Sequence, residues 1–117
     1  MKKAIIIGIG LNRGLGAKLA KRFAAEGLHV YAASRTQANL DALISEIEKS
    51  GGTATAVCTD ATDEIQIKSL FDAAEENLSL TIFYTAFGFS GRIIDMDSEY
   101  FEKSWKVSCF GGFLFGR

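Results

Sequence analysis

The sequence contains no proline, one histidine and two cysteines in 117 residues. Without proline, charge blocks or repeats there is no sign of a linker, so we expect one domain. No window approaches the roughly 18 uninterrupted apolar residues of a membrane-spanning helix, which predicts a soluble chain without a membrane partner. Cys58 and Cys109 lie far apart among apolar or small residues. We therefore expect no disulfide framework, but two reduced, buried thiols in a cytoplasmic protein.

An excess of one charge is also absent, because 13 basic residues face 14 acidic ones and the net charge is −1. No global attraction to nucleic acid is therefore expected, and any anion site must be local. His29 has no carboxylate or cysteine cluster nearby, so we predict no metal site. The acidic residues Asp95, Asp97 and Glu99 are interpreted as caps and dipole partners of a helix.

One stretch, Ala4–Gly16, carries the strongest signal in the chain. An apolar β-branched run breaks into glycines and an amphipathic helix pattern follows at once. This order predicts a buried strand that turns sharply into a helix N-terminus. Such a turn suits phosphate, because the first helical amides point outward and glycine lets an anion approach the backbone.

Three more strands and three more helices are expected after it. The strands are predicted at His29–Ser34, Thr53–Thr59 and Leu80–Phe87. The first helix is expected to end at Gly27, and the second to run from a cap at Thr36 to Gly51 and Gly52. The third is expected to start at Asp60 or Thr62 and end near Asn77, and the last to begin near 97–99 with Phe101, Ser104, Trp105 and Ser108 on its inner face.

Alternating strands and helices predict a doubly wound α/β fold with a parallel sheet covered on both faces. Ligands bind such sheets beyond the carboxyl ends of the strands, where the strand order reverses. Here that place is expected between the first and fourth strands. Four stretches should meet there, namely 10–16, 34–35, 60–61 and 84–86.

The glycines are spaced Gly10-x-x-x-Gly14-x-Gly16, which differs from the Gly-x-Gly-x-x-Gly dinucleotide fingerprint. This spacing after a first strand resembles the signature of the short-chain dehydrogenase/reductase family, which binds NAD(H) or NADP(H) on a Rossmann fold. The resemblance continues through the later strand ends to Arg117 and implies that Asp60 serves the adenine ring. The cofactor-binding residues that it implies are Gly10, Asn12, Arg13, Gly14, Leu15, Gly16, Ser34, Arg35, Thr36, Asp60, Ala61, Tyr84, Thr85 and Ala86.

The charges near the second strand favour NADP(H). An NAD site normally presents Asp or Glu about twenty residues after the glycines to the ribose 2′-hydroxyl, whereas a 2′-phosphate needs a cation. Here Ser34 ends the strand, Arg35 follows it, and Arg13 lies in the glycine loop. Two guanidinium groups would suit a doubly charged phosphate. NAD(H) remains an alternative if only one arginine takes part.

The chain departs from the family pattern at two places. The family usually has Asn-Asn-Ala-Gly after the fourth strand, where this chain reads Tyr84-Thr85-Ala86-Phe87-Gly88. We align 84–86 with the latter part of that motif, and 86–88 is the competing register. An asparagine of the family's proton relay corresponds to Ser108, which cannot supply the same carbonyl and amide pair. Helix packing is the favoured role of Ser108.

The family's catalytic pair, Tyr-x-x-x-Lys, does not occur in these 117 residues. A phenol needs a nearby cation to exchange its proton at neutral pH, and Tyr100 and Lys103 are only three residues apart. We therefore assign no catalytic residue. Residues 1–117 are interpreted as the cofactor-binding part of an oxidoreductase for carbonyl or alcohol substrates, inactive by itself. The alternatives are a non-catalytic NADP(H)-binding regulator and a purely structural subunit.

The segment 109–115 is almost entirely apolar or glycine. One stripe of a surface helix cannot bury all of it, which predicts packing against another segment or subunit. In the family the corresponding helix commonly lies in a dimer interface. We therefore expect a homo-oligomer formed through the helix near 99–117, and an isolated chain that associates or is only marginally stable.

Overall fold

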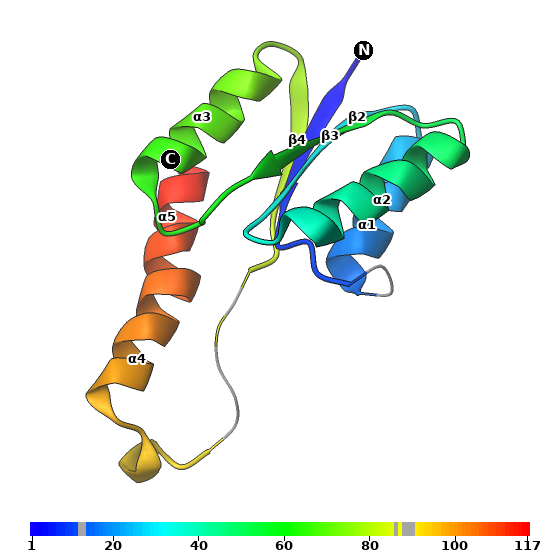
Figure 1. The fold of residues 1–117 in the computed structure, drawn as a ribbon. Helices are drawn as coiled ribbons and strands as arrows, with labels where there is room; N and C mark the ends of the chain where they lie inside the picture. Colours follow the sequence, from blue (N-terminus) through cyan, green and yellow to red (C-terminus); the bar gives the residue numbers. More distant parts are fainter. Residues whose placement is uncertain (12–13, 86, 88–90) are drawn as a thin grey trace.

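The computed structural model describes residues 1–11, 14–85, 87 and 91–117. Four strands alternate with helices from the N-terminus onward, and a long helical segment closes the chain (Figure 1). The elements are β1 (Lys3–Ile7), α1 (Leu15–Ala25), β2 (His29–Ser34), α2 (Gln37–Lys49), β3 (Ala54–Cys58), α3 (Glu64–Ala74), β4 (Leu78–Phe83), the 3₁₀ turn η1 (Ile93–Asp95), α4 (Ser98–Trp105), the π-helical segment η2 (Lys106–Phe110) and α5 (Gly111–Gly116).

The strands form one parallel sheet in the order β3-β2-β1-β4. After β3 at one edge, the chain crosses to the far side of β1, so the strand order reverses between β1 and β4. This confirms the predicted doubly wound α/β arrangement and its reversal point. The carboxyl ends of all four strands lie at the same edge of the sheet.

Alternating side chains of the central strands give the sheet two apolar faces. Ile6, Val30 and Ala32 pack against the buried stripes of α1 and α2, whereas Ile5 and Ile7 pack against α3 and α5. Figure 1 shows these two helical layers on opposite sides of the sheet. The sheet is thus anchored on both faces, and its carboxyl edge is left for a ligand.

Two glycines bring the backbone of β1, α1 and β4 into close contact. Gly8 has φ +110°, and a Cβ there would lie 2.1 Å from the carbonyl oxygen of Tyr84. A Cβ on Gly16 would lie 2.6 Å from the carbonyl oxygen of Gly8. Real side chains do not tolerate such distances, so only glycine permits α1 to start this close to the ends of β1 and β4.

Several predicted element ends are wrong. The fourth strand occupies Leu78–Phe83 rather than Leu80–Phe87. Its partner β1 turns away at Gly8, so a longer β4 would have no strand to pair with. The cap of α3 is Asp63, which accepts a hydrogen bond from the Gln66 amide, and neither Asp60 nor Thr62.

The third helix also ends earlier than expected, whereas the predicted cap positions of α2 and α4 are confirmed. Helix α3 stops at Ala74, three residues before Asn77, because Glu75 already adopts a positive φ of 53°. Thr36 stands at the N-cap of α2 as predicted, but its side chain makes no capping hydrogen bond. Asp97 is the predicted cap of the last helix and accepts a hydrogen bond from the Tyr100 amide at 2.7 Å.

Both cysteines are free, but the prediction that they are buried is wrong. Cys58 ends the edge strand β3 on the side away from the core, where its thiol donates a hydrogen bond to the Arg35 carbonyl at 3.5 Å. Cys109 lies on the exposed side of η2. The prediction rested on apolar neighbours in the sequence. An edge strand and a projecting helix each leave one side in solvent, and the two cysteines lie on those sides.

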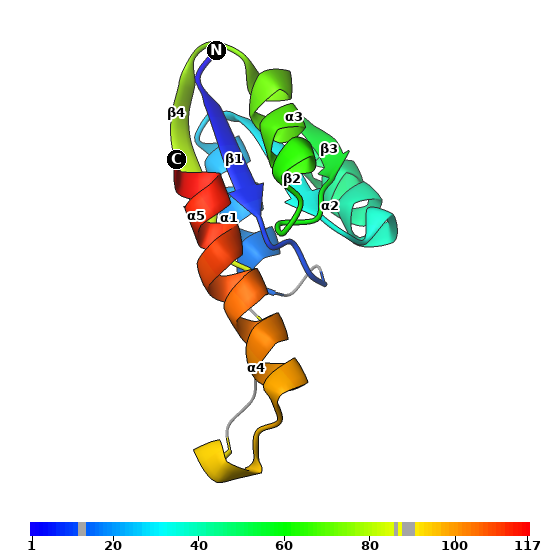
Figure 2. The same cartoon turned by 90° about the vertical axis from the view of Figure 1, so that its left-hand side faces the viewer.

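The last helical segment, 98–116, extends beyond the sheet (Figure 2). Its extension makes the molecule 50 Å long, and the radius of gyration is 14.9 Å, above the roughly 13.4 Å expected of a compact chain of this length. Gly111, Leu114 and Phe115 are its buried residues, packed near Ala61 and Phe83. Those contacts fix the rotation of the segment.

The predicted inner face of this segment is wrong for three of its four residues. Phe101, Trp105 and Ser108 are exposed, and only Ser104 is half-buried, with its hydroxyl donating to the Phe87 carbonyl at 2.8 Å. An apolar stripe normally marks the buried side of a helix, but here the sheet ends before it reaches these residues. In the part of the chain that the structure describes, no helix is long and apolar enough to cross a membrane.

Candidate functional site

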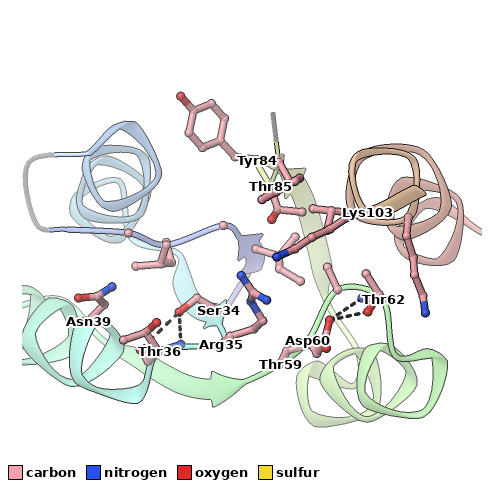
Figure 3. A pocket seen from close by; sticks show the side chains of 18 residues that line it. Ser34, Arg35, Thr36, Asn39, Thr59, Asp60, Thr62, Tyr84, Thr85 and Lys103 are labelled. Carbon is pink, nitrogen blue, oxygen red and sulfur yellow. Dashed lines mark hydrogen bonds between the residues drawn. The ribbon is translucent and has the colours of Figure 1, made fainter. Parts of the chain in front are cut away.

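A cavity of about 420 Å³ lies at the carboxyl edge of the sheet, where the strand order reverses. The strand ends form its floor, and α2, α3 and the last helical segment surround it (Figure 3). It is lined by Ile7, Gly8, Ile9, Gly10, Ser34, Arg35, Thr36, Asn39, Thr59, Asp60, Ala61, Thr62, Tyr84, Thr85, Phe87, Lys103, Lys106 and Val107. We call it the crevice.

The structure brings residues from all four predicted stretches to the crevice. Of the residues proposed from the sequence, those that line it are Gly10, Ser34, Arg35, Thr36, Asp60, Ala61, Tyr84 and Thr85. Gly14, Leu15 and Gly16 do not line it, because they form the cap and first turn of α1. Asn12, Arg13 and Ala86 lie outside the described residues.

The three glycines of the motif have different surroundings. Gly14 is the N-cap of α1, and its amide donates to the Leu11 carbonyl at 2.8 Å. Gly16 is needed for the contact with Gly8 described above. A Cβ on Gly10, in contrast, would meet nothing within 4 Å, and Gly10 lines the crevice. The fold therefore does not require glycine at position 10, and the open space above it is available to a ligand.

The end of β2 presents a cation and no carboxylate to the crevice. Ser34 and Thr36 close a small turn, in which the Thr36 amide donates to the Ser34 hydroxyl at 3.3 Å. Arg35 lies between them, and Figure 3 shows its side chain reaching into the crevice. Asp60 is the sole acidic residue among the lining residues that the structure describes. The end of β2 therefore offers the crevice a positive charge and no carboxylate.

Asp60 follows β3 and forms a tight turn with Thr62. The Thr62 amide and hydroxyl donate to the same Asp60 carboxylate oxygen at 2.9 and 2.8 Å. These two bonds, the amide first, hold the pKa of Asp60 below its usual range against partial burial, and the charges of Arg35 and Lys106 add to the effect. Asp60 is therefore a fixed hydrogen-bond acceptor at neutral pH.

The stretch after β4 contributes mainly backbone. The Tyr84 amide donates to the Ile7 carbonyl at 2.9 Å and extends the pairing of β4 by one bond. The Tyr84 ring is about half exposed, and in Figure 3 it points away from Arg35 and Asp60. Thr85 lines the crevice beside it. Among the described residues, no group of three or more His, Cys, Asp or Glu side chains gathers to hold a metal.

Sequence reasoning missed one whole wall of the crevice. Lys103, Lys106 and Val107 line it from α4 and η2, and the Lys103 ammonium lies 4.4 Å from the centre of the Phe87 ring. Helical spacing back from the buried Gly111 would have found Val107 and Lys103, since residues four and eight positions earlier share its side. Also missed were Ile7, Gly8, Ile9, Asn39, Thr59, Thr62 and Phe87.

Comparison with known proteins gives consistent results. The family model described as short chain dehydrogenase matches residues 2–117. L-xylulose reductase of Mesocricetus auratus is 32% identical over an alignment of 113 residues that covers 92% of this chain and 41% of that enzyme. The crystal structure of a short-chain dehydrogenase from Rhodopseudomonas palustris is 34% identical, with a TM-score of 0.85 over all of this chain and 56% of that one.

A more distant structure shares the fold. Actinorhodin polyketide ketoreductase, solved as a variant with NADPH, is 20% identical and has a TM-score of 0.88 over 97% of this chain and 44% of its own. The chain thus spans about half of the length of these three proteins. With the family model matched over almost every residue and the crevice at the predicted edge of the sheet, the chain belongs to the short-chain dehydrogenase family.

Proposed function

We propose that residues 1–117 are the cofactor-binding part of an oxidoreductase that prefers NADP(H) and interconverts a carbonyl compound and an alcohol. The family and the relatives' names support the reaction class. The single observation that carries the cofactor preference is the end of β2, where Ser34 and Arg35 stand in place of a carboxylate. An arginine can hold a phosphate through two parallel hydrogen bonds, and a carboxylate there would repel it.

The crevice has the size of a ligand pocket, and its groups suit a dinucleotide. Its volume lies within the range of about 300–1,000 Å³ typical of ligand pockets. Space is open above Gly10, Asp60 is a fixed acceptor for an adenine amine, and Arg35 faces the same space. We propose that Asn12, Arg13, Leu15 and Ala86 complete the site together with Gly14, Gly16, Ser34, Thr36, Ala61, Tyr84 and Thr85.

The proposed reduction transfers one hydride and one proton to the carbonyl group, which together are two electrons and two protons. A reduced nicotinamide bound in the crevice would supply hydride to the carbonyl carbon, while a proton from an acid reaches the carbonyl oxygen and gives the alcohol. In this proposal the described side chains bind the dinucleotide and orient it. No Tyr-x-x-x-Lys occurs among these 117 residues, so we propose that the acid comes from elsewhere in the protein and that the isolated segment does not turn over.

Binding of NADPH and NADH, followed by nicotinamide fluorescence, tests the preference. We expect the wild type to bind NADPH more tightly than NADH. Arg35→Ser should weaken the binding of NADPH by about tenfold or more and change the binding of NADH little, because a charge-assisted hydrogen bond to phosphate is lost. Arg22→Ser is a matched control, since Arg22 pairs with Glu26 on the outer side of α1. Equal affinity of the two cofactors in the wild type would contradict the proposal.

A second candidate is a regulator that binds NADP(H) without catalysis. The observation that favours it is the missing tyrosine and lysine pair. Oxidation of NADPH with a panel of aldehydes and ketones, followed at constant protein concentration, separates the two candidates. Turnover by the full chain supports the enzyme, whereas saturable binding without turnover supports the regulator.

A further inference from the structure

The inward side of the last helical segment changes its character along its length. At the sheet this side is Gly111, Leu114 and Phe115, all buried. Farther toward the N-terminus the same side carries Val107, Lys106 and Lys103, which line the crevice. A stripe that served packing alone would remain apolar, because an apolar surface gains by burial and a lysine does not. Two lysines appear where the stripe passes the ligand space.

One of these two lysines, Lys103, lies across the crevice from the end of β2. In Figure 3, Lys103 extends into the space from the side opposite to Thr36 and Asn39, and Arg35 lies between the two sides. In the described part of the chain, Arg35, Lys103 and Lys106 have no ion-pair partner. Three cations therefore face one space in which Asp60 is the sole described carboxylate.

Lys106 acts on the part of the crevice next to Asp60, where the adenosine of a bound dinucleotide would lie. Lys106 lowers the pKa of Asp60 through its charge, as Arg35 does, so both act on the space beyond β2 and β3. Gly111 fixes the distance of the wall, because a Cβ there would lie 3.1 Å from the Ala61 carbonyl oxygen. The glycine thus allows the helix to approach the end of β3 closely, one turn away from Lys106 and Val107.

We propose that Lys103 and Lys106 are specificity-determining residues that, together with Arg35, attract the 2′-phosphate of NADP(H) from the opposite wall. This inference rests on the proposed function. A 2′-phosphate carries up to two negative charges at neutral pH, whereas the 2′-hydroxyl of NAD(H) carries none. Attraction from flanking lysines therefore favours one cofactor over the other, and because both lysines are exposed it should fall as salt rises.

The test uses probes without nicotinamide, so that it reads binding at the adenosine end alone. Adenosine 2′,5′-bisphosphate and adenosine 5′-monophosphate are titrated calorimetrically into the full chain and into Lys103→Gln, Lys106→Gln and the double variant. We expect the double variant to bind the bisphosphate about tenfold more weakly and the monophosphate less than about twofold more weakly, given the modest attraction between exposed charges. The salt dependence of bisphosphate binding should become shallower.

Two controls isolate charge from other effects. Lys49→Gln removes an exposed lysine at the far end of α2 and should change neither affinity. The Lys103→Arg/Lys106→Arg variant keeps both charges and should retain the preference. Thermal melts of all variants verify that they fold.

The outcomes separate this inference from the proposed function. If the wild type fails to prefer the bisphosphate, the proposed NADP(H) preference is wrong. If the wild type prefers it and the double glutamine variant keeps both the preference and the salt dependence, the role of the two lysines is overturned. Equal weakening of both probes would overturn it as well, since the lysines would then act on a part that the probes share.

Discussion

Gly8, Gly10 and Gly16 lie within nine residues, but they have different physical roles. At Gly8 and Gly16 the neighbouring backbone leaves no room for a Cβ, and Gly8 also needs a positive φ. At Gly10 there is room, and the space belongs to the crevice. Only Gly8 and Gly16 are required by the fold, and we propose that glycine at position 10 lets a ligand approach the backbone.

Alanine substitutions should separate these roles. Gly8→Ala and Gly16→Ala should each lower the free energy of unfolding by about 2 kcal/mol or more, because backbone atoms must move. Gly10→Ala should leave it unchanged or slightly raised, but should weaken dinucleotide binding. Denaturant melts and cofactor titrations of the three variants check this. A Gly10→Ala variant with wild-type affinity would contradict the assigned role of Gly10.

His29 lies at the opposite end of the sheet from the crevice. Its two ring nitrogens are each 2.8 Å from a hydroxyl oxygen, of Thr53 and of Thr55. Its pKa is lowered from the ordinary value of 6.5, first by partial burial and then by the charge of Lys3. His29 has therefore a structural role in joining β2 to the start of β3, and its neutral form is the one that the fold favours.

This shift makes stability depend on pH. Between the folded and unfolded pKa values the unfolded chain binds more protons, so the stabilisation is present above pH 6.5 and is lost as the pH falls from there toward the folded pKa. The free energy of unfolding should therefore decrease from about pH 7 to pH 5, and His29→Asn should flatten this change. Urea melts over that range measure it. An identical slope in the variant would rule out His29 as the cause.

At the scale of elements, helix starts differ in how their amides are satisfied. Asp63 caps α3 by accepting from the Gln66 amide, and the Gln66 side chain donates back to the other carboxylate oxygen at 3.2 Å. Thr36 occupies the equivalent position of α2 without a capping bond. Both residue types are common caps, so sequence alone could not rank them.

The two caps therefore provide a matched comparison. Asp63→Ala should lower the free energy of unfolding by about 1 kcal/mol, because an amide at the helix start loses its partner. Thr36→Ala should cost clearly less, since no capping bond is lost. Denaturant melts of both variants give the comparison. If the threonine variant were the less stable of the two, the assignment of the caps would be wrong.

At the scale of the whole molecule, the last helical segment leaves an aromatic surface uncovered. Phe101, Trp105 and Phe113 are 64%, 48% and 59% exposed, and these three side chains do not line the crevice. Several large apolar side chains that are exposed on one helical segment indicate a surface for protein contact. Phe101 and Trp105 are also two of the four residues that helical periodicity alone placed inside.

We expect residues 1–117 to self-associate through this surface. Light scattering should give a mass above 12.7 kDa, and Phe101→Ser with Phe113→Ser should shift it toward the monomer, because the apolar contact area is lost. Glu99→Ser serves as a control at an exposed position of the same helix. A wild-type chain that stays monomeric at high concentration would contradict this expectation.

The sequence by itself determined the strand and helix order, the reversal between β1 and β4, and the meeting of four strand ends, because local periodicity and right-handed crossovers leave few other arrangements. The exact strand ends, the exposure of Cys58 and Cys109, and the close contact of Gly8 with the Tyr84 carbonyl depended on neighbours distant in sequence. Above all, the contact of Gly111 with Ala61 sets the rotation of the last helix, turning Lys103 and Lys106 toward the crevice and the aromatic residues outward. Only tertiary packing could decide that choice, since both sides of the helix carry side chains that periodicity alone can place inside.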